Sequence, residues 1–151
     1  MTNGASVPKT ILVLCTGNSA RSIMAEAYLN HIGKGRWQAF SAGSKPTGRV
    51  NPFALTTLIK VGIPAPAAPR SKSWHEFTQT TGTAIDVVVT VCDNAANETC
   101  PRFPGTARKI HLGFPDPAAT DGSDTAKAES FRVVFEAMRP KLDALMAELS
   151  T

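Results

Sequence analysis

Short apolar runs alternate with longer amphipathic stretches along the chain. Runs of apolar and β-branched residues are typical of strands, and we expect four of them, at 10–14, 37–42, 85–91 and 109–112. The stretches between and after them place apolar residues at helical spacing and predict helices at 22–32, 52–61 and 125–149. Strands that alternate with helices indicate an α/β fold with a parallel sheet that is covered on both faces.

The last predicted helix has the strongest amphipathic pattern. Its apolar stripe forms one face that should pack on the sheet: Phe131, Val134, Phe135, Met138, Leu142, Leu145 and Leu149. Pro140 lies inside this stretch and is expected to kink or split the helix, because proline removes a backbone hydrogen bond. No domain boundary is visible, so we predict one domain over residues 1–151, with residues 1–8 flexible.

The composition is that of an ordinary globular protein. Hydrophobic residues make up 42% of the 151 residues, and no apolar run is long enough to span a bilayer. The first residues lack the features of a signal peptide, so we expect a cytoplasmic protein without a membrane partner. The net charge of +4 comes from scattered basic residues, which favours a small anionic substrate over nucleic acid. In a reducing cytoplasm the three cysteines are expected to be reactive or buried thiols.

The segment from Cys15 to Ser22 is the strongest chemical signal. It has the sequence Cys-Thr-Gly-Asn-Ser-Ala-Arg-Ser, and it joins a predicted buried strand directly to a predicted helix. Its small residues allow the backbone to curl around a ligand, with several N–H groups and the helix N-terminus pointing at one anion. We therefore predict an oxyanion-binding loop made of Thr16, Gly17, Asn18, Ser19, Ala20 and Arg21.

Cys15 is the predicted nucleophile of this loop. A thiolate at a helix N-terminus and beside an arginine has a lowered pKa, which makes it reactive at neutral pH. Ser22 is placed to donate a hydrogen bond to the Cys15 sulfur, and the planar fork of Arg21 matches two oxygens of a tetrahedral oxyanion. Cys15 is then able to attack the central atom while the loop holds the outer oxygens.

The loop resembles the phosphate-binding loop of the low-molecular-weight protein tyrosine phosphatases and of the arsenate reductases that share their fold. Ser41-Ala42-Gly43, at the end of the second predicted strand, resembles that superfamily too, and the likeness spans nearly the whole chain. The resemblance implies a four-stranded parallel sheet in the order 2-1-3-4, flanked by helices.

Asp116-Pro117 follows the last predicted strand, where a carboxylic acid is able to protonate a leaving oxygen. In both branches of the superfamily an Asp-Pro at this place acts as the general acid. The tyrosine phosphatases also carry aromatic residues just after it, which line a slot for the phenyl ring of the substrate. Here Ala118, Ala119 and Thr120 follow, and their lack of an aromatic ring favours the reductase branch.

Two further cysteines favour the same branch. The stretch from Val91 to Pro101 resembles the redox loop of arsenate reductases and contains Cys92 and Cys100. A second thiol that attacks the Cys15–arsenic adduct at sulfur releases arsenite and leaves a disulfide. Cys92 ends the strand expected beside the first one and is placed for this attack, after which Cys100 carries the disulfide to the surface. Taken alone, each is also compatible with a small core residue or a loop bystander.

The electron donor is left open by the spacing of these cysteines. Seven residues separate Cys92 from Cys100, slightly more than in the thioredoxin-coupled members of the family. Other members use glutathione and glutaredoxin, and an external thiol is also able to replace Cys100 or even Cys92. We expect no tightly bound cofactor and an external thiol reductant, either thioredoxin or glutathione with glutaredoxin.

These features predict an arsenate reductase. Phosphate or sulfate is expected to bind as an analogue of its arsenate substrate. The same loop also allows a residual phosphatase activity. The first alternative is a low-molecular-weight protein tyrosine phosphatase. A non-catalytic regulator that binds an oxyanion or arsenite is less favoured, because the set of Cys15, Arg21 and Asp116 is intact.

A cation site is a further implication of the resemblance. In some reductase relatives an asparagine, a glutamate and a serine bind potassium, and the matching residues here are Asn18, Glu26 and Ser41. The alternative, a capped loop and a solvated glutamate, is slightly favoured. We interpret Arg70 and Lys72 as solvated surface charges, which is the commoner state of such residues.

Overall fold

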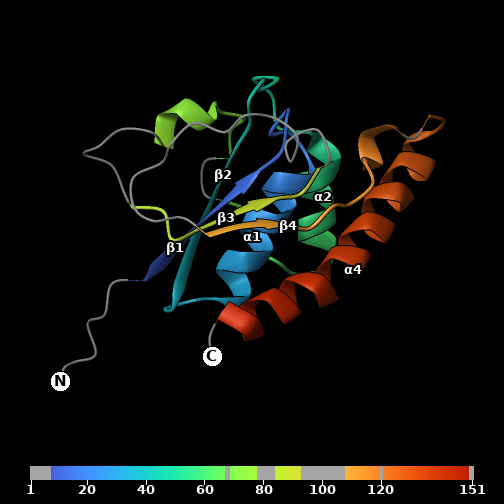
Figure 1. The fold of residues 1–151 in the computed structure, drawn as a ribbon. Coiled ribbons are helices and arrows are strands. Elements are labelled where there is room, and N and C mark those ends of the chain that lie inside the picture. The colour runs from blue at the N-terminus through green and yellow to red at the C-terminus, as the bar shows by residue number, and fades with distance from the viewer. Residues whose placement is uncertain (1–7, 67–68, 78–83, 93–107, 120, 150–151) are drawn as a thin grey trace.

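The computed structural model describes residues 8–66, 69–77, 84–92, 108–119 and 121–149. Its centre is a four-stranded sheet in the order β2-β1-β3-β4, formed by β1 (Lys9–Leu14), β2 (Trp37–Ala42), β3 (Val87–Thr90) and β4 (Arg108–His111) (Figure 1). Every neighbouring pair of strands is parallel. The α/β class that the sequence pattern predicts and the strand order that the family resemblance implies are both confirmed.

The two faces of the sheet bury alternate residues of the same strands. In β1, Ile11 and Val13 belong to the larger core, whereas Leu12 and Leu14 belong to a smaller core on the opposite face. All four side chains are fully buried. A strand that is covered on both faces has no polar side, which explains why this run is continuously apolar.

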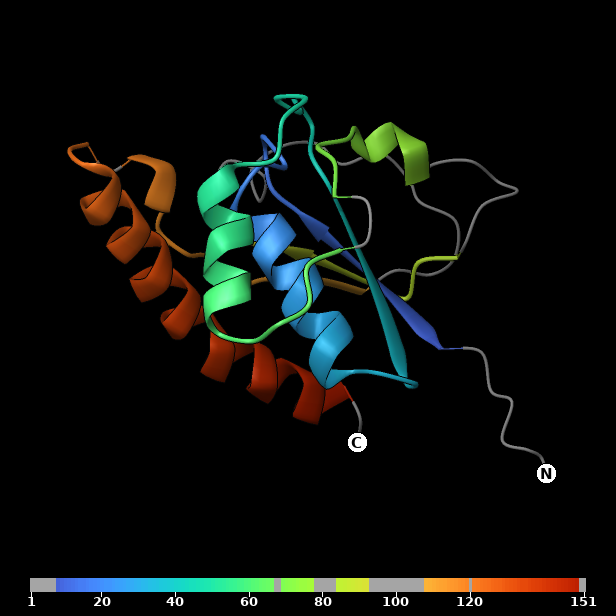
Figure 2. The ribbon, with the colours of Figure 1, turned by 180° about the vertical axis from the view of Figure 1, so that it is seen from behind.

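Three helices cover the face of the larger core: α1 (Arg21–Ile32), α2 (Pro52–Lys60) and α4 (Asp124–Leu149) (Figure 2). The start of α2 follows from its sequence, because Asn51 accepts a hydrogen bond from the Phe53 N–H and Pro52 takes the first helical position. Among the described residues, no helix combines the length and the apolar composition that a membrane crossing requires.

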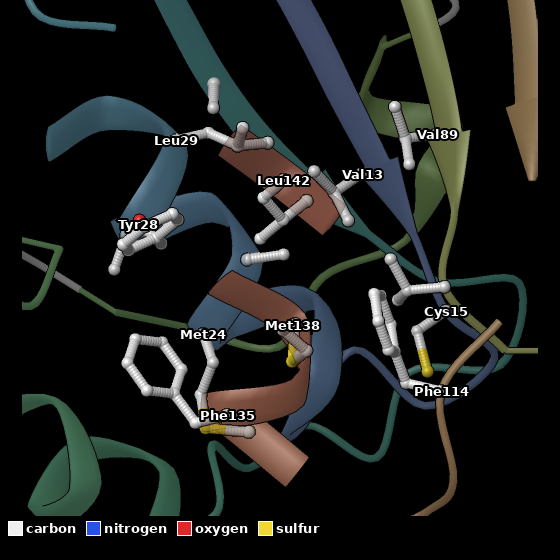
Figure 3. Close-up of a cluster of buried hydrophobic side chains, with 14 of the residues drawn as sticks. Val13, Cys15, Met24, Tyr28, Leu29, Val89, Phe114, Phe135, Met138 and Leu142 are labelled. Carbon is white, nitrogen blue, oxygen red and sulfur yellow. The ribbon is translucent and has the colours of Figure 1, made fainter. Parts of the chain in front are cut away.

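α4 continues without a break through Pro140. Of the two effects expected of this proline, the split is therefore wrong, and the kink stays a prediction. Pro140 is exposed, so the carbonyl group that loses its helical donor lies on the solvent side of the helix. Met138 and Leu142, on either side of it, are fully buried and hold both halves of the helix on the sheet (Figure 3). The rest of the predicted apolar stripe is buried, except that Leu149 is only partly buried.

The second face of the sheet is covered by the short helix η1 (Trp74–Phe77). Trp74 and Phe77 pack on the smaller core, and Phe77 lies 5.6 Å from Phe40 between ring centroids. Just before this helix, Ser73 forms an isolated parallel bridge with Gly43 at the end of β2. This bridge brings the segment around residue 72 to the carboxyl edge of the sheet.

The carboxyl edge of the sheet places the loops that carry the predicted chemistry. β1 and β3 pair with Leu14 opposite Thr90, so Cys15 and Cys92 follow at the same edge. Figure 3 shows Cys15 at one end of the larger core, on the side where Phe114 lies. Next to them, a Cβ atom on Gly43 would lie 2.4 Å from the Thr16 carbonyl oxygen, so only glycine allows this close approach.

Candidate active site

A neighbouring segment, 45–51, donates hydrogen bonds to backbone carbonyl groups of loop 15–20. The carbonyl groups of Thr16, Gly17 and Ser19 accept hydrogen bonds of 2.9 to 3.0 Å from N–H groups of segment 45–51. Because the N–H and C=O groups of a curled loop point in different directions, this arrangement turns the N–H groups away from that segment. The loop is therefore held in shape from outside through its carbonyl groups.

The opposite edge of the loop presents backbone donors. In the part of the chain that the structure describes, the N–H groups of Asn18, Ser19 and Ala20 have no protein acceptor. Asn18 has a left-handed backbone with φ of 46°, a conformation that asparagine tolerates better than most residues. Donors gathered at the N-terminus of α1 in this way form the kind of concave site that binds a tetrahedral oxyanion.

Cys15 and Cys92 lie in contact at this loop, and neither forms a disulfide. The Thr16 N–H donates a hydrogen bond to the Cys92 sulfur at 3.3 Å. A hydrogen bond with Cys92 and burial raise the pKa of the Cys15 thiol, whereas the Arg21 guanidinium and the Gly17 N–H act in the opposite direction. The structure thus brings together two thiols that the sequence places after separate strands.

The expectation of a lowered pKa for Cys15 is wrong for this arrangement of the two thiols. The reason is tertiary, because the hydrogen bond with Cys92 and the burial of the site both favour the protonated thiol of Cys15. Arg21 and the loop backbone do favour the thiolate, as the sequence predicts. A movement of Cys92 away from Cys15 removes the largest contribution that opposes them.

Ser22 contacts the loop through Asn18. Its side chain is fully buried, and its Oγ accepts a hydrogen bond of 2.8 Å from the Asn18 side-chain amide. Among the hydrogen bonds of the described residues, none joins Ser22 to the Cys15 sulfur. In this state Ser22 therefore supports the left-handed residue of the loop, a contact that the sequence analysis did not anticipate.

Arg21 and Asp116 come together beside the loop, as the sequence predicts. Arg21 Nη2 lies 4.0 Å from Asp116 Oδ2, and Arg21 Nη1 donates to the Phe114 carbonyl oxygen at 2.9 Å. A guanidinium group carries five N–H donors, so these contacts leave donors for an oxyanion. The Asp116 side chain is 47% exposed and accepts from the Ala118 N–H at 2.9 Å, which holds it at the start of the short helix η2 (Pro117–Ala119).

The structure describes two of the three cysteines. Cys15 and Cys92 are 5% and 3% exposed, so neither sulfur is open to a bulky partner in this state. Cys100 lies outside the described residues, as do its neighbours between 93 and 107. A role for Cys100 in a thiol relay therefore stays a prediction.

A polar cluster connects α1, β2 and the segment before η1. Ser41 Oγ donates to the Glu26 carboxylate, and the Lys72 ammonium group lies 3.5 Å from Ser41 Oγ. Burial raises the pKa of Glu26 and lowers the pKa of Lys72. The interpretation of Lys72 as a surface charge is therefore wrong, since Lys72 is only 9% exposed. Glu26 is partly buried and hydrogen-bonded to Ser41, so the interpretation of it as a solvated group is wrong too. The polar run Ser71-Lys72-Ser73 contains no signal of this burial.

Potassium binding by Asn18, Glu26 and Ser41 stays a prediction. The three residues do belong to one hydrogen-bonded region, because Asn18 accepts from the Lys72 N–H while Ser41 contacts the Lys72 ammonium group. A positive charge thus already lies against Ser41 and Glu26 in this chain.

A groove of about 520 Å³ opens between α2 and α4, away from the Cys15 loop. Phe53, Lys60 and Arg132 are among the residues that line it, and none of its lining residues belongs to loop 15–22. The candidate active site is therefore the N–H cradle of the loop rather than this groove.

Comparison with known proteins identifies the family of this site. The family model of low molecular weight phosphotyrosine protein phosphatases matches residues 10–151. The chain belongs to this family. Within it, an arsenate reductase of Halalkalibacterium halodurans is 38% identical over 126 residues, which cover 83% of this chain and 86% of that protein.

Solved structures of low molecular weight phosphatase-like proteins agree with the fold. An arsenate reductase from Archaeoglobus fulgidus aligns with a TM-score of 0.69 and 26% identity, over 91% of this chain and 98% of that one. A low molecular weight protein tyrosine phosphatase from T. tengcongensis aligns with a TM-score of 0.74 over 93% and 99% of the two chains. Its identity is 24%, so that likeness concerns the fold alone. The family resemblance seen in the sequence is confirmed.

Proposed function

We propose that this member of the family is an arsenate reductase, which converts arsenate to arsenite with Cys15 as its nucleophile. The observation that carries the proposal is the contact of Cys92 with the Cys15 loop, where the Thr16 N–H holds the Cys92 sulfur at 3.3 Å. A phosphatase needs one nucleophilic thiol, whereas the reduction of arsenate requires two electrons, which a pair of thiols supplies. The arsenate reductases among its relatives support the same assignment.

In the first step, the Cys15 thiolate attacks the arsenic atom of a bound arsenate, and one oxygen leaves as water. The loop N–H groups and Arg21 hold the other oxygens and stabilise the charge that develops on them. Asp116 supplies the proton to the leaving oxygen. The contact of 4.0 Å between Asp116 and Arg21 supports this assignment, because it keeps the acid beside the group that orients the oxyanion.

In the second step, the Cys92 thiolate attacks the Cys15 sulfur of the adduct. A sulfur–sulfur bond forms and the sulfur–arsenic bond breaks, and its electron pair leaves with arsenic, which passes from the pentavalent to the trivalent state. Arsenite is released and a Cys15–Cys92 disulfide remains. The parallel register of β1 and β3 supports this step, because both cysteines follow their strands at the same edge of the sheet.

An external thiol reductant then restores the two thiols. Both sulfurs are almost fully buried, so a protein donor requires that the disulfide be carried outward, which is the role predicted for Cys100. A small thiol such as glutathione is less restricted by burial and is able to attack the adduct directly. Thioredoxin and glutathione with glutaredoxin are therefore both candidate donors, and they differ in whether Cys100 is needed.

Arsenite production by the purified chain tests the proposal, with thioredoxin plus thioredoxin reductase in one assay and glutathione plus glutaredoxin in another. We expect turnover with at least one donor. Cys15→Ser should reduce turnover below about a thousandth of the parent rate, the scale of losing an essential catalytic group. Strong hydrolysis of p-nitrophenyl phosphate without arsenate reduction under either donor would overturn the proposal in favour of a phosphatase.

Two cysteine variants separate the steps of the relay. Cys92→Ser should lose arsenate turnover and keep hydrolysis of p-nitrophenyl phosphate, which needs only the first loop. Cys100→Ser should complete one turnover with thioredoxin and then stop as a Cys15–Cys92 disulfide, visible by mass spectrometry of the trapped protein. If both variants turn over at the parent rate with glutathione and glutaredoxin, only Cys15 belongs to the mechanism.

A low phosphatase activity is expected beside the reduction. The same loop, Arg21 and Asp116 suit the hydrolysis of a phosphate monoester. The helix η2 that follows Asp116 carries alanines and no aromatic ring to pack on a phenyl group. Hydrolysis of p-nitrophenyl phosphate should therefore be measurable and weakly saturable.

A further inference from the structure

Lys72 is a buried lysine that the proposed reaction does not use. Its residue is only 9% exposed, and its Nζ lies 3.5 Å from Ser41 Oγ and 3.3 Å from the Arg70 carbonyl oxygen. A buried ammonium group is unfavourable unless an acidic group compensates its charge. The surroundings of Lys72 therefore have to contain a carboxylate.

That carboxylate belongs to Glu26 of α1 and is reached through Ser41, whose hydroxyl group donates to it. Burial raises the pKa of Glu26, and the nearby Lys72 opposes this shift. Burial lowers the pKa of Lys72, and Glu26 opposes that shift in turn. The buried Lys72 and the partly buried Glu26 therefore each favour the ionised form of the other.

The exposed ion pair beside this cluster, Arg70–Glu76, has a smaller effect on the buried groups. Arg70 forms a bidentate ion pair with Glu76, and their side chains are 60% and 42% exposed. Solvent screens such a pair, so it contributes little to the energy of the buried groups. Lys72 is thus the cation that lies against the Ser41–Glu26 pair.

The main chain of the same residue holds the oxyanion loop. The Lys72 N–H donates to Asn18 Oδ1 at 2.8 Å, and the Lys72 carbonyl oxygen accepts from the Gly43 N–H at 2.9 Å. Asn18 is the loop residue with the left-handed backbone, and its amide also donates to Ser22 Oγ. A shift of the Lys72 backbone therefore moves the loop residue whose N–H belongs to the oxyanion cradle.

We propose that Lys72 is a positioning residue for the oxyanion loop, a built-in cation whose pairing with Glu26 anchors the backbone that holds Asn18. The side chain is fixed between Ser41 and the Arg70 carbonyl group, and the N–H of the same residue sets the place of Asn18. The inference rests on the proposed role of the Cys15 loop in oxyanion binding. It does not depend on arsenate reduction.

Binding of inorganic phosphate to the full chain, followed by isothermal titration calorimetry, tests this inference. Lys72→Met keeps the length of the side chain and the backbone donor but removes the ammonium group. Phosphate should bind about tenfold more weakly to this variant, within the range of coupling between linked sites in proteins. Lys34→Met is the matched control, because it removes the same charge from an exposed position after α1 and should bind phosphate like the parent.

The double variant E26Q/K72M distinguishes positioning from a direct effect of charge on the anion. Its phosphate affinity should stay about as weak as that of Lys72→Met, because the pairing that anchors the Lys72 backbone is absent from both variants. If Lys72 acts by attracting the anion itself, the double variant will regain affinity toward the parent, because removal of the Glu26 charge restores the local net charge. That result, or equal affinities of Lys72→Met and the parent, overturns the proposal.

Urea unfolding of the same variants provides the second measurement. A lysine with a merely structural role lowers the unfolding midpoint and leaves the phosphate affinity of the folded protein unchanged, and this outcome also overturns the proposal. If Lys72→Met does not fold, recovery of folding in E26Q/K72M together with weak phosphate binding supports the pairing, while parental phosphate binding or failure of the double variant to fold overturns it. Absence of phosphate binding in the parent would instead overturn the oxyanion loop itself.

Discussion

Cys92 lies in hydrogen-bond contact with Cys15, and the Thr16 N–H donates to its sulfur at 3.3 Å. The two cysteines follow strands that are distant in sequence but adjacent in the sheet, so they meet at its carboxyl edge. The hydrogen bond with Cys92 favours the protonated form of Cys15, which links the ionisation of the proposed nucleophile to the position of its proposed resolving partner.

Replacing Cys92 by alanine should lower the pKa of Cys15. The hydrogen bond with Cys92 is the largest contribution that raises this pKa, and without it Arg21 and the Gly17 N–H are opposed mainly by burial. Alkylation rates measured against pH should show the Cys15 thiolate forming at lower pH than in the parent. A Cys100→Ser background in both proteins keeps that third thiol out of the measurement. An unchanged or higher pKa would show that Cys92 does not control the ionisation of Cys15.

Arg21→Lys should weaken oxyanion binding although it keeps the positive charge. Lysine lacks the planar fork and cannot reproduce the bond of 2.9 Å to the Phe114 carbonyl oxygen together with two bonds to an oxyanion. Phosphate or arsenate should bind about tenfold to a hundredfold more weakly, which corresponds to about 1.5–3 kcal/mol for a lost charged hydrogen bond. Calorimetric titration with circular dichroism as a folding control measures this, and parental affinity would exclude Arg21 from oxyanion recognition.

Asp116→Asn should slow the formation of the Cys15–substrate adduct. For p-nitrophenyl phosphate the loss should be about 10²–10⁴-fold, the usual contribution of a general acid. For arsenate it should be smaller, because the leaving oxygen of arsenate is able to take its proton from water beforehand. Asp121→Asn removes an exposed carboxylate nearby and should leave both rates unchanged. Equal rates of Asp116→Asn and the parent on both substrates would assign the proton to another group.

The stability difference between the parent and Glu26→Gln should depend on pH. Burial raises the pKa of Glu26 above its ordinary value of 4.5, so the folded state binds this proton more tightly than the unfolded chain. The stability that Glu26 contributes is therefore complete below that value and is lost as the pH rises through the folded-state pKa. Urea unfolding of both proteins over this range isolates the contribution, because the other carboxylates are common to both. A difference that grows with pH would contradict the burial of Glu26.

Most of the fold was predictable because its signals are local. The strand 10–14 is continuously apolar, and Asn51-Pro52 marks the start of α2 by capping and by a fixed backbone angle. Pro140 is the exception, since buried neighbours on the same helix face hold α4 together where local preference predicts a break. Packing against the sheet therefore keeps α4 helical on both sides of Pro140.

The candidate site, too, has features that the sequence predicts and features that it does not. The loop from Cys15 to Ser22 is contiguous, so its small residues, its arginine and the helix after it could be recognised together in the sequence. The pKa of Cys15 could not be predicted correctly, because its largest cause is Cys92, a residue of another strand's loop. The burial of Lys72 could not be predicted either, because a polar run carries no sign of the groups that will surround it.

The sequence by itself determined the strands, the helices and the loop for which we propose oxyanion binding and the Cys15 nucleophile. Only the tertiary structure decided which groups surround them. The Thr16–Cys92 contact joins residues 76 positions apart, Arg21 and Phe114 are 93 apart, and Asn18 and Lys72 are 54 apart. Local preference and apolar spacing depend on neighbours along the chain, whereas the ionisation of a thiol or a buried lysine depends on the nearest charges and dipoles in space.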